Sequence, residues 1–362
     1  MSTEARVQRF KQELQASHIN IHSLKRLAML GIPEHANLRA TVWKVLLGYL
    51  PPSPDEWSAT LARRRTQYHV FCSELIIDPK QPLPRDHPSG PLAPSQGLAP
   101  EGGDPLHAAD VTGGEHPLSL NTASRWHTFF QDEETQQQIT RDVMRTHPDL
   151  QFFSGRSEGA ELHRQRALFM YAKLNPGLCY IQGMNELIAP LYFLFKHDPD
   201  PQARQYAEAD AFWCFMELIS EFRDHFCAQL DNAQTGIKAT IRRLMTVLQA
   251  CDYKLWQHIE VTCKVDPQYY AFRWITLLLA QEFPFPDTLR TWDTILGDPH
   301  GRMDCLLRIC TAMILGQKER LMQGDFTVIM KTLQRYPLTN LEALLHKAAS
   351  LPSCKDILGS SP

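Results

Sequence analysis

The sequence predicts an all-α protein built from many helices of moderate length, and two observations support this class. Apolar residues recur at a spacing of three and four in almost every segment, which is the period of a helix with one buried face. The period-two alternation that is typical of strands is nearly absent, and the run FTVIM at residues 326–330 is too short to indicate a strand. With 43% hydrophobic residues, the 362-residue chain can form a sizeable core.

Three helices are predicted before residue 76. The first two have apolar faces formed by Val7, Phe10 and Leu14 and by Leu38, Val42, Leu46 and Tyr49. The third is expected to begin at SPDE, with Ser53 as N-cap, Pro54 in the first turn and Glu56 completing a capping box. Its apolar face then continues through Trp57, Leu61, Tyr68, Phe71 and Leu75. Further on, the widest apolar stripe of the chain predicts a buried helix through Phe212, Phe215, Met216, Ile219 and Phe226.

One stretch departs from the helical pattern. Residues 79–118 contain nine prolines, six glycines and no aromatic side chain. Such a composition buries too little apolar surface to offset the entropy lost on ordering. The segment is therefore predicted to be a flexible insertion loop inside one domain, because the helices before it are too few to close a core alone.

Composition and motif searches exclude several classes of protein. A net charge of -3 predicts no general affinity for nucleic acid. No apolar run approaches the length of about 20 residues that a transmembrane helix needs, and Pro190 interrupts the longest run, LIAPLYFLF. The charged start of the chain lacks the apolar core of a signal peptide, and the nine cysteines include no CxxC pair, so we expect reduced thiols and a soluble, cytoplasmic protein. The motifs GxSxG, GxxxxGK[ST] and HExxH do not occur.

A metal phosphohydrolase site is one alternative that the sequence suggests. Its carrier is the pair His197-Asp198 in KHDPDP, since neighbouring histidine and aspartate can bind a catalytic metal on a helical scaffold. Pro199 and Pro201 instead favour a surface turn, so we expect no metal site there.

The segment DEETQQQITRDVMRTHPDLQFF predicts a helix with one unusual face. Asp132 is expected to cap this helix and Pro148 to end it. Ile139 and Val143 are four residues apart and should face the core. Asp142 and Arg145 are three residues apart on an adjoining face, where the carboxylate can steady the guanidinium. By itself this pair is better explained as a surface ion pair that complements the helix dipole.

Four motifs in a fixed order change that interpretation. ITRDVMR fits IxxDxxR, and YIQG fits YxQG some thirty residues later. GIPEHANLRATVWKVLLGYLP precedes them, and FRWITLLLAQEFPFPDTLRTWD follows. Together, over about residues 31–340, they resemble the TBC domain, the family of GTPase-activating proteins for Rab GTPases. The phrases FMYAKLNPG, QGMNE and GDFTVIM are most similar to the subgroup of TBC domain family member 13.

The resemblance implies a role for individual residues. Arg145 occupies the arginine-finger position and Gln182 the glutamine-finger position. Ile139 and Asp142 would support Arg145, while Tyr180 and Gly183 would shape the turn that presents Gln182. The opening motif is mainly structural in the family, and its positions are matched here by Arg39, Trp43 and Lys44. Two positions depart from the family pattern: Gln281 stands where arginine is common, and Thr291 replaces the leucine of LWD.

The chemistry of the two fingers fits GTP hydrolysis. A guanidinium in a dry interface stabilises the charge that develops on the γ-phosphoryl oxygens, and it is typically worth ~10³–10⁵ in rate. A carboxamide has both a donor and an acceptor, so it can orient the attacking water without losing a proton. We therefore expect a GTPase activator that is not itself a hydrolase; a catalytically silent scaffold or Rab-binding effector is the alternative.

The resemblance also implies domains, partners and location. Residues 1–30 would form a helical extension, 31–345 the TBC domain with 79–118 inserted, and 346–362 a tail. The partner would be a Rab-family GTPase in its GTP form, which brings the GTP and Mg²⁺, so the chain would need no cofactor or metal of its own. We expect a cytoplasmic protein that regulates vesicle and membrane trafficking and reaches endomembranes as a peripheral protein through its partner.

Overall fold

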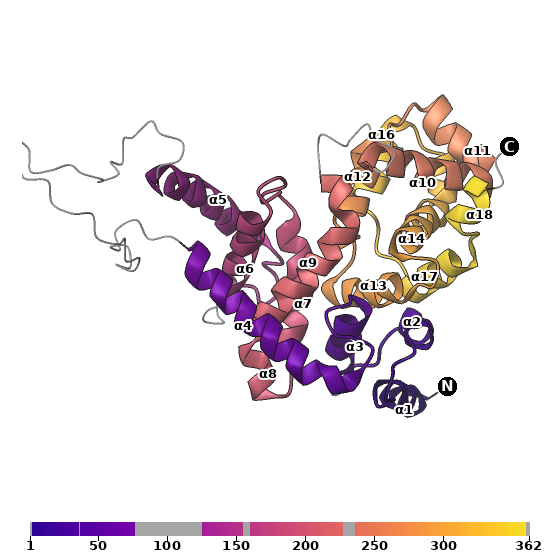
Figure 1. Ribbon diagram of the computed structural model, residues 1–362. Helices are drawn as coiled ribbons and strands as arrows, with labels where there is room; N and C mark the ends of the chain where they lie inside the picture. The colour runs from indigo at the N-terminus through magenta and orange to yellow at the C-terminus, as the bar shows by residue number, and fades with distance from the viewer. Residues whose placement is uncertain (1, 36, 77–124, 155–159, 227–235, 360–362) are drawn as a thin grey trace, which may run out of the picture.

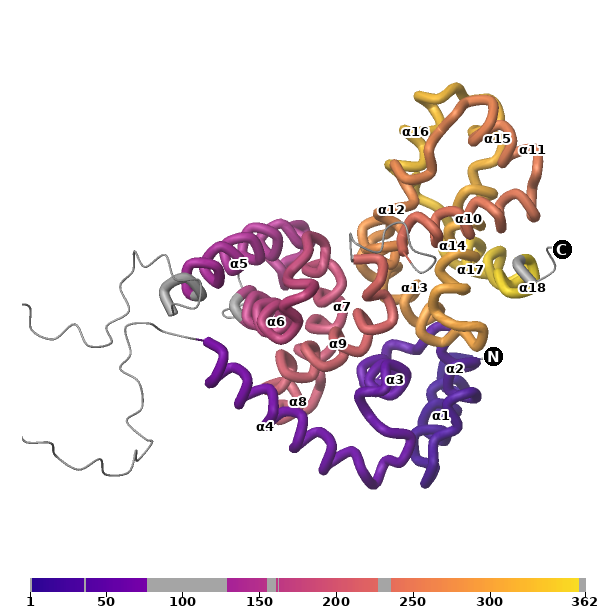
Figure 2. Tube along the Cα trace, turned by 45° about the horizontal axis from the view of Figure 1, so that its top comes forward, coloured from indigo at the N-terminus to yellow at the C-terminus, as the bar shows by residue number. Residues whose placement is uncertain are grey.

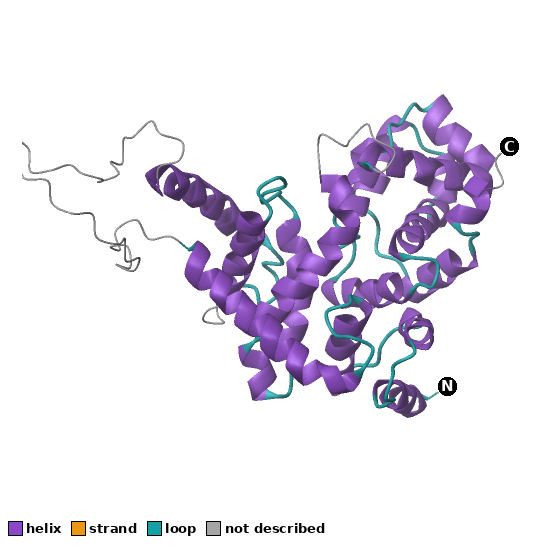
Figure 3. Cartoon of the chain, in the orientation of Figure 1, coloured by secondary structure: helices purple, strands orange, loops and turns teal. Residues whose placement is uncertain are grey.

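The computed structural model describes residues 2–35, 37–76, 125–154, 160–226 and 236–359. All regular elements in these ranges are helices and none is a strand, which confirms the all-α prediction (Figure 3). FTVIM lies at the start of a helix, since the isolated alternation was too short to define a strand. The insertion predicted for 79–118 falls outside the described residues.

The helices have short to moderate lengths. In the first part of the chain they are α1 Thr3–Leu14, α2 Ile21–Met29, α3 Leu38–Leu46, α4 Trp57–Leu75, α5 Arg125–Arg145, α6 Ala160–Leu174, α7 Met184–Lys196, α8 Pro201–Gln205 and α9 Ala207–Phe226. The later ones are α10 Ile237–Cys251, α11 Tyr253–Trp256, α12 Gln268–Thr276, α13 Phe285–Gly297, α14 Arg302–Gly316, α15 Lys318–Met322, α16 Phe326–Gln334, α17 Leu341–Ser350 and α18 Cys354–Gly359. A 3₁₀ turn, η1 Pro54–Glu56, precedes α4, and a π turn, η3 Gln257–Thr262, follows α11.

The helices form two groups that meet along α9. Helices α4 to α8 lie on one side of α9, and α10 to α18 lie on the other (Figures 1 and 2). In the first group α7 packs on α9 and α5 packs on α6, while in the second α14 contacts α10, α13 and α17. The predicted stripe of α9 lies in this core, with Phe212, Phe215 and Ile219 buried.

The first thirty residues pack on the second group. Helix α2 lies against α13, and the two backbones approach so closely that a Cβ on Gly297 would lie 2.5 Å from the Met29 nitrogen. Val7 and Phe10 of α1 are buried, as the periodicity predicts. The N-terminal segment therefore shares its core with the rest of the described chain.

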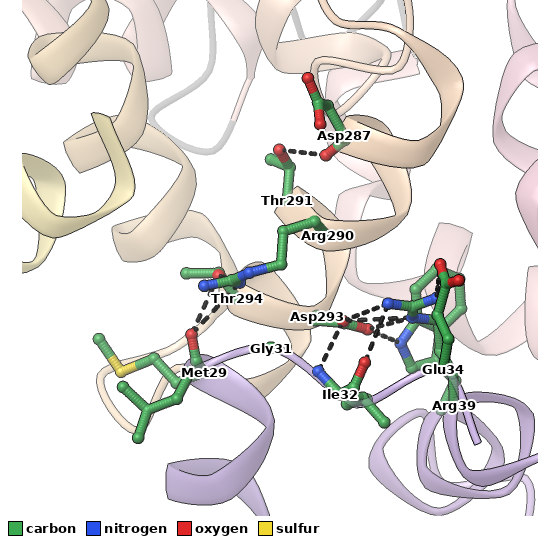
Figure 4. Close-up of polar contacts among 12 residues, drawn as sticks. Met29, Gly31, Ile32, Glu34, Arg39, Asp287, Arg290, Thr291, Asp293 and Thr294 are labelled. Carbon is green, nitrogen blue, oxygen red and sulfur yellow. Dashed lines mark hydrogen bonds and ion pairs between the residues drawn. The ribbon is translucent and has the colours of Figure 1, made fainter. Parts of the chain in front are cut away.

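A buried carboxylate joins the segment between α2 and α3 to α13. Asp293 accepts hydrogen bonds from the Ile32 backbone N–H at 2.9 Å and from Trp43 Nε1 at 2.8 Å, and the Arg39 guanidinium lies beside it at 3.1 Å (Figure 4). Burial raises the pKa of Asp293, and the Arg39 charge opposes that rise. Because each partner comes from the opening motif or the residues just before it, the motif contributes directly to packing.

Lys44 of the same motif binds a second buried carboxylate. Its Nζ lies 2.6 Å from Asp210 of α9, and Arg65 of α4 donates two hydrogen bonds of 2.8 Å to the same carboxylate. Burial alone would raise the pKa of Asp210, but Lys44 and Arg65 outweigh it and hold that pKa below its usual value. Three helices are thereby connected through one carboxylate.

Two predicted helix caps differ from the structure. Ser53 is the N-cap of the 3₁₀ turn Pro54–Glu56, which leads directly into α4 at Trp57, and Pro54 lies in its first turn as predicted, but Ser53 makes no side-chain capping bond. Helix α5 begins at Arg125, so Asp132 lies inside it and forms an ion pair with Lys173 of α6 at 2.8 Å. At Asp132 the local capping signal gave way to a contact between helices.

Within the described ranges, we find no helix whose length and hydropathy would allow it to cross a bilayer.

Candidate functional site

Arg145 is the last residue of α5, and its own helix holds it. Ile139 and Val143 are buried, as predicted, and fix the orientation of the helix. Arg145 Nη2 donates to Asp142 Oδ1, and Arg145 Nε donates to the Arg141 carbonyl at 3.2 Å. The Arg145 side chain is nevertheless 68% exposed, whereas the Asp142 side chain is 6% exposed. The exposed Arg145 guanidinium is thus held by the buried Asp142 carboxylate.

Gln182 lies in the tight turn before α7. Gly183 has a φ of 105°, in the left-handed region that glycine tolerates. A Cβ on Gly183 would lie 2.6 Å from Leu277 Cδ2, so the turn also needs a small residue to pack on the C-terminal group. Gln182 is exposed, and its carboxamide makes no hydrogen bond to a residue that the structure describes. The Gln182 side chain therefore points out of the core.

A buried polar network connects the two segments. Tyr180 Oη lies 2.9 Å from Asp142 Oδ2 and 3.2 Å from Asn185 Oδ1. Asn185 Oδ1 accepts from the Gly183 N–H at 3.1 Å. Burial, reinforced by the Asp142 charge, raises the pKa of Tyr180, so the hydroxyl keeps its proton and donates it.

Arg145 and Gln182 line the same cavity. It has a volume of about 470 Å³, and its floor includes Asp142, Gly183, Asn185 and Glu186. A second hollow, of about 490 Å³, also shares Asp142, Arg145 and Gln182 and extends along α5. The two exposed side chains thus stand between adjoining hollows, where a bound surface could reach both.

A second wall of the first cavity comes from α12 and the residues after it: Phe272, Arg273, Thr276, Leu277 and Gln281. Leu278 and Leu279 have positive φ values of 48° and 61°, and Trp292 Nε1 holds this turn by donating to the Leu278 carbonyl at 3.1 Å. Trp292 in turn stacks on Trp43 of the opening motif, with ring centroids 5.7 Å apart. The two tryptophans thereby support the wall on which Gly183 packs.

The two departures from the family pattern lie in different environments. Gln281 is exposed at the cavity, and its side chain opposes the rise in the pKa of Glu186. Thr291 is buried, and its hydroxyl donates to the Asp287 carbonyl of the same helix at 2.8 Å (Figure 4). Gln281 can therefore touch a partner, whereas Thr291 is a packing residue.

Sequence reasoning missed the residues behind the two exposed side chains. Asn185 and Glu186 belong to the floor of the cavity, and Thr146 binds Asn185 from the end of α5. Burial raises the pKa of Glu186, which Asn185 and Gln281 oppose by hydrogen bonding. The available signal was the polar pair NE directly after QGM, at the start of an otherwise apolar helix.

The pair His197-Asp198 does not form a metal site in the described structure. His197 lies exposed at the end of α7, whereas Asp198 is buried and accepts hydrogen bonds from Asn37 Nδ2 and, at 2.9 Å, the Asp200 N–H. No group of three or more histidine, cysteine, aspartate or glutamate side chains among the described residues could hold a metal ion. The Asp198 carboxylate instead stabilises a turn.

Comparisons with known proteins agree with the resemblance. The Rab-GTPase-TBC domain family matches residues 125–322. TBC1 domain family member 13 of Homo sapiens is 34% identical, over 97% of this chain and 99% of its own length; the Mus musculus protein is 35% identical over the same shares. Both confirm the predicted subgroup.

A solved structure shows the same fold. The Ypt/Rab-GAP domain of Gyp1p has a TM-score of 0.73 at 23% identity, over 96% of this chain and 98% of that one. The family match covers the middle of the chain, and the relatives and the solved structure cover nearly all of it. The chain therefore belongs to the Rab-GTPase-TBC domain family.

Proposed function

We propose that this protein is a GTPase-activating protein that accelerates GTP hydrolysis by a Rab-family small GTPase, with Arg145 and Gln182 supplied in trans. The observation that carries the proposal is that both side chains are exposed at one cavity while a buried network holds their backbones. Family membership supports it, and so does a relative named GTPase-activating protein gyp1, from Schizosaccharomyces pombe, which is 26% identical over 95% of this chain and 60% of its own length.

Arg145 is suited to stabilise the transition state. Its charge is available at the surface, and the bond to Asp142 fixes the direction of the guanidinium while leaving other N–H groups for a ligand. When a partner covers the cavity and displaces water, that charge acts at low dielectric on the phosphoryl oxygens. Arginine is better suited than lysine, because its planar fork donates several hydrogen bonds in a fixed geometry.

Gln182 is suited to orient the attacking water. The water must donate one hydrogen bond and accept another to be aimed at the γ-phosphorus, and a carboxamide offers both groups. No described neighbour occupies the Gln182 amide, and the turn at Gly183 carries it to the cavity edge. The residue would contribute only in the complex, where the reacting phosphate lies.

The proposal has consequences for cofactors and location. GTP and Mg²⁺ belong to the partner, so the chain needs no cofactor of its own and is not itself a hydrolase. Acting on a GTP-bound Rab would place the protein in the regulation of vesicle and membrane trafficking. It would be cytoplasmic and recruited to endomembranes through the partner.

A panel of purified, GTP-loaded Rabs tests the proposal. We expect accelerated phosphate release with at least one member, and a loss of about 10³-fold for both Arg145→Ala and Arg145→Lys with Rab binding retained. Arg320→Lys, an exposed arginine in the last turn of α15, is the matched control and should keep full activity. Binding without acceleration across the panel would favour the alternative of a catalytically silent scaffold. Full activity of Arg145→Lys would show that a positive charge at this position is sufficient and that the arginine-finger role is wrong.

A further inference from the structure

Asn185 contacts both segments that carry the proposed fingers, and it does so next to each finger. It lies in the first turn of α7 and is buried. Its Oδ1 accepts from the Gly183 N–H, the peptide directly after Gln182, at 3.1 Å. Its Nδ2 donates to Thr146 Oγ1, directly after Arg145, at 2.9 Å. A single amide therefore connects the ends of the two segments.

Chemistry fixes which end of this amide faces which segment. The Gly183 N–H can only donate, so the atom facing it must be the oxygen. The NH₂ group then faces Thr146 Oγ1 and, at 3.1 Å, Glu186 Oε1, both of which can accept. The Thr146 hydroxyl donates its proton to the Asp142 carbonyl at 2.9 Å. It therefore accepts the hydrogen bond from Asn185. Donors and acceptors match only in this orientation.

The contacts continue to both proposed fingers. On one side, Asp142 holds Arg145 and accepts from Tyr180, which lies 3.2 Å from Asn185. On the other, Gln182 has no side-chain bond to a described residue, so its position depends on its backbone, which Asn185 fixes at Gly183. Leu277 supports the same turn through apolar contact only.

We infer that Asn185 is a positioning residue that sets the place of Gln182 relative to Arg145, a role that rests on the proposed function. Asn185 does not itself reach the reacting atoms. Its loss would let the Gln182 turn shift while Arg145 stays on its own helix. A shift of about 1 Å in a catalytic group can cost about 10²-fold in rate. The loss should therefore appear in the maximal rate of hydrolysis rather than in the concentration of activator that gives half of that rate.

The test measures single-turnover hydrolysis on the Rab that the panel identifies, with Asn185→Ala in the wild-type and Gln182→Ala backgrounds. We expect Asn185→Ala alone to lower the maximal rate by about 10²-fold with half-saturation changed less than about threefold. In the Gln182→Ala background it should cost less than about threefold more, because no carboxamide remains to be placed.

Thr146→Val provides a second variant with a matched control. It removes the hydroxyl partner of Asn185, while Thr311→Val removes the same kind of buried hydroxyl, bonded at 2.8 Å to the Leu307 carbonyl, in α14 far along the chain. Both should lower the melting temperature to a similar degree, and only Thr146→Val should lower the maximal rate. This variant decides the matter if Asn185→Ala fails to fold.

Two results would overturn the inference. One is an equal loss from Asn185→Ala in both backgrounds, which would mean that Asn185 acts through something other than Gln182. The other is equal activity of the Thr146→Val and Thr311→Val variants. Wild-type activity of the Gln182→Ala variant, in contrast, would contradict the glutamine finger of the proposed function itself, whatever the Asn185 variants do.

Discussion

At the scale of single residues, access to water separates the proposed fingers from their supports. Arg145 and Gln182 are exposed, whereas the groups behind them are buried. Burial raises the pKa of Tyr180 and of Glu186 and lowers that of His147. In each of the three groups burial therefore disfavours the charged form.

A buried histidine away from the cavity gives a pH dependence of stability. Burial, with Arg243 adding to it and Asp224 opposing it, lowers the pKa of His225 from 6.5 to about 4. Between these pH values the unfolded chain binds a proton that the folded protein refuses, so stability is lost as pH falls through this range. We expect the wild type to lose about 3 kcal/mol more than His225→Gln between pH 7 and pH 4. Urea unfolding of both proteins over this range would measure it; parallel pH curves would contradict the assignment.

At the scale of elements, the site depends on a turn that only glycine can form. The turn before α7 needs a positive φ at Gly183 and also packs that residue against Leu277. Gly48, just after α3, has a φ of 84°, and a Cβ added there would meet no atom within 4 Å, so it shares the conformation without the contact. A comparison of the two glycines therefore distinguishes the effect of the left-handed backbone, which both share, from the effect of the close contact, which only Gly183 has.

Replacing each glycine with alanine should give different results. Both variants should lose about 1–2 kcal/mol of stability from the left-handed conformation. Gly183→Ala must also displace Leu277, which moves the Gln182 turn, so it should lose at least about tenfold in activation of the Rab. Gly48→Ala should keep its activity. Chemical denaturation and phosphate release, measured on both variants, test this, and equal activities would show that the Gly183 packing is not needed.

What the sequence could predict follows from the range of each interaction. The Asp142–Arg145 pair and the burial of Ile139 and Val143 depend on spacing within one helix, and they are present as predicted. The prediction that α5 begins at Asp132 was wrong, because Asp132 forms an ion pair with Lys173 of α6 and does not cap the helix.

The contact of Asn185 with Thr146 joins residues 39 apart in the sequence. No periodicity or capping signal specifies such a pairing, because it depends on how α5 and α7 pack. The same holds for the Leu277 wall, which comes from the second group of helices. The exposed residues of the candidate site, and supports that belong to the same motifs such as Asp142 and Gly183, were therefore predictable. The supports that depend on packing between helices were not.

At the scale of the whole molecule, the cavity requires both groups of helices. Its floor belongs to α5 and α7, and its second wall belongs to α12 and the following turn. The wall is tied to the N-terminal part of the chain by the Trp43–Trp292 stack and by Asp293, which receives bonds from Trp43 and the Ile32 backbone (Figure 4). The opening motif thus supports the site from a distance.

Residues 79–118 should be dispensable for this architecture. Their composition predicts a linker, and the helices on either side, α4 and α5, both pack on α6. Replacing the segment with a short Gly/Ser loop should leave the far-UV helix signal, the melting temperature and activation of the Rab nearly unchanged. A large fall in any of the three would show that the segment contributes to the fold or to the partner interface.

In the proposed mechanism, this chain supplies the carboxamide that orients the water. Ras-type GTPases carry a glutamine of their own for that purpose. If Gln182 takes over the role, the glutamine of the partner becomes largely redundant, and Gln182→Glu cannot replace Gln182, because a carboxylate has no donor and lies near phosphate charge.

The most direct measurement is single-turnover phosphate release for the wild type and for Gln182→Ala, each paired with a Rab that keeps its glutamine and with one in which it is changed to alanine. We predict that the wild-type protein activates both Rabs, and that Gln182→Ala loses most of its activity towards both while still binding them. Activation of the unaltered Rab by Gln182→Ala at the wild-type rate, in a folded and bound protein, would contradict the claim.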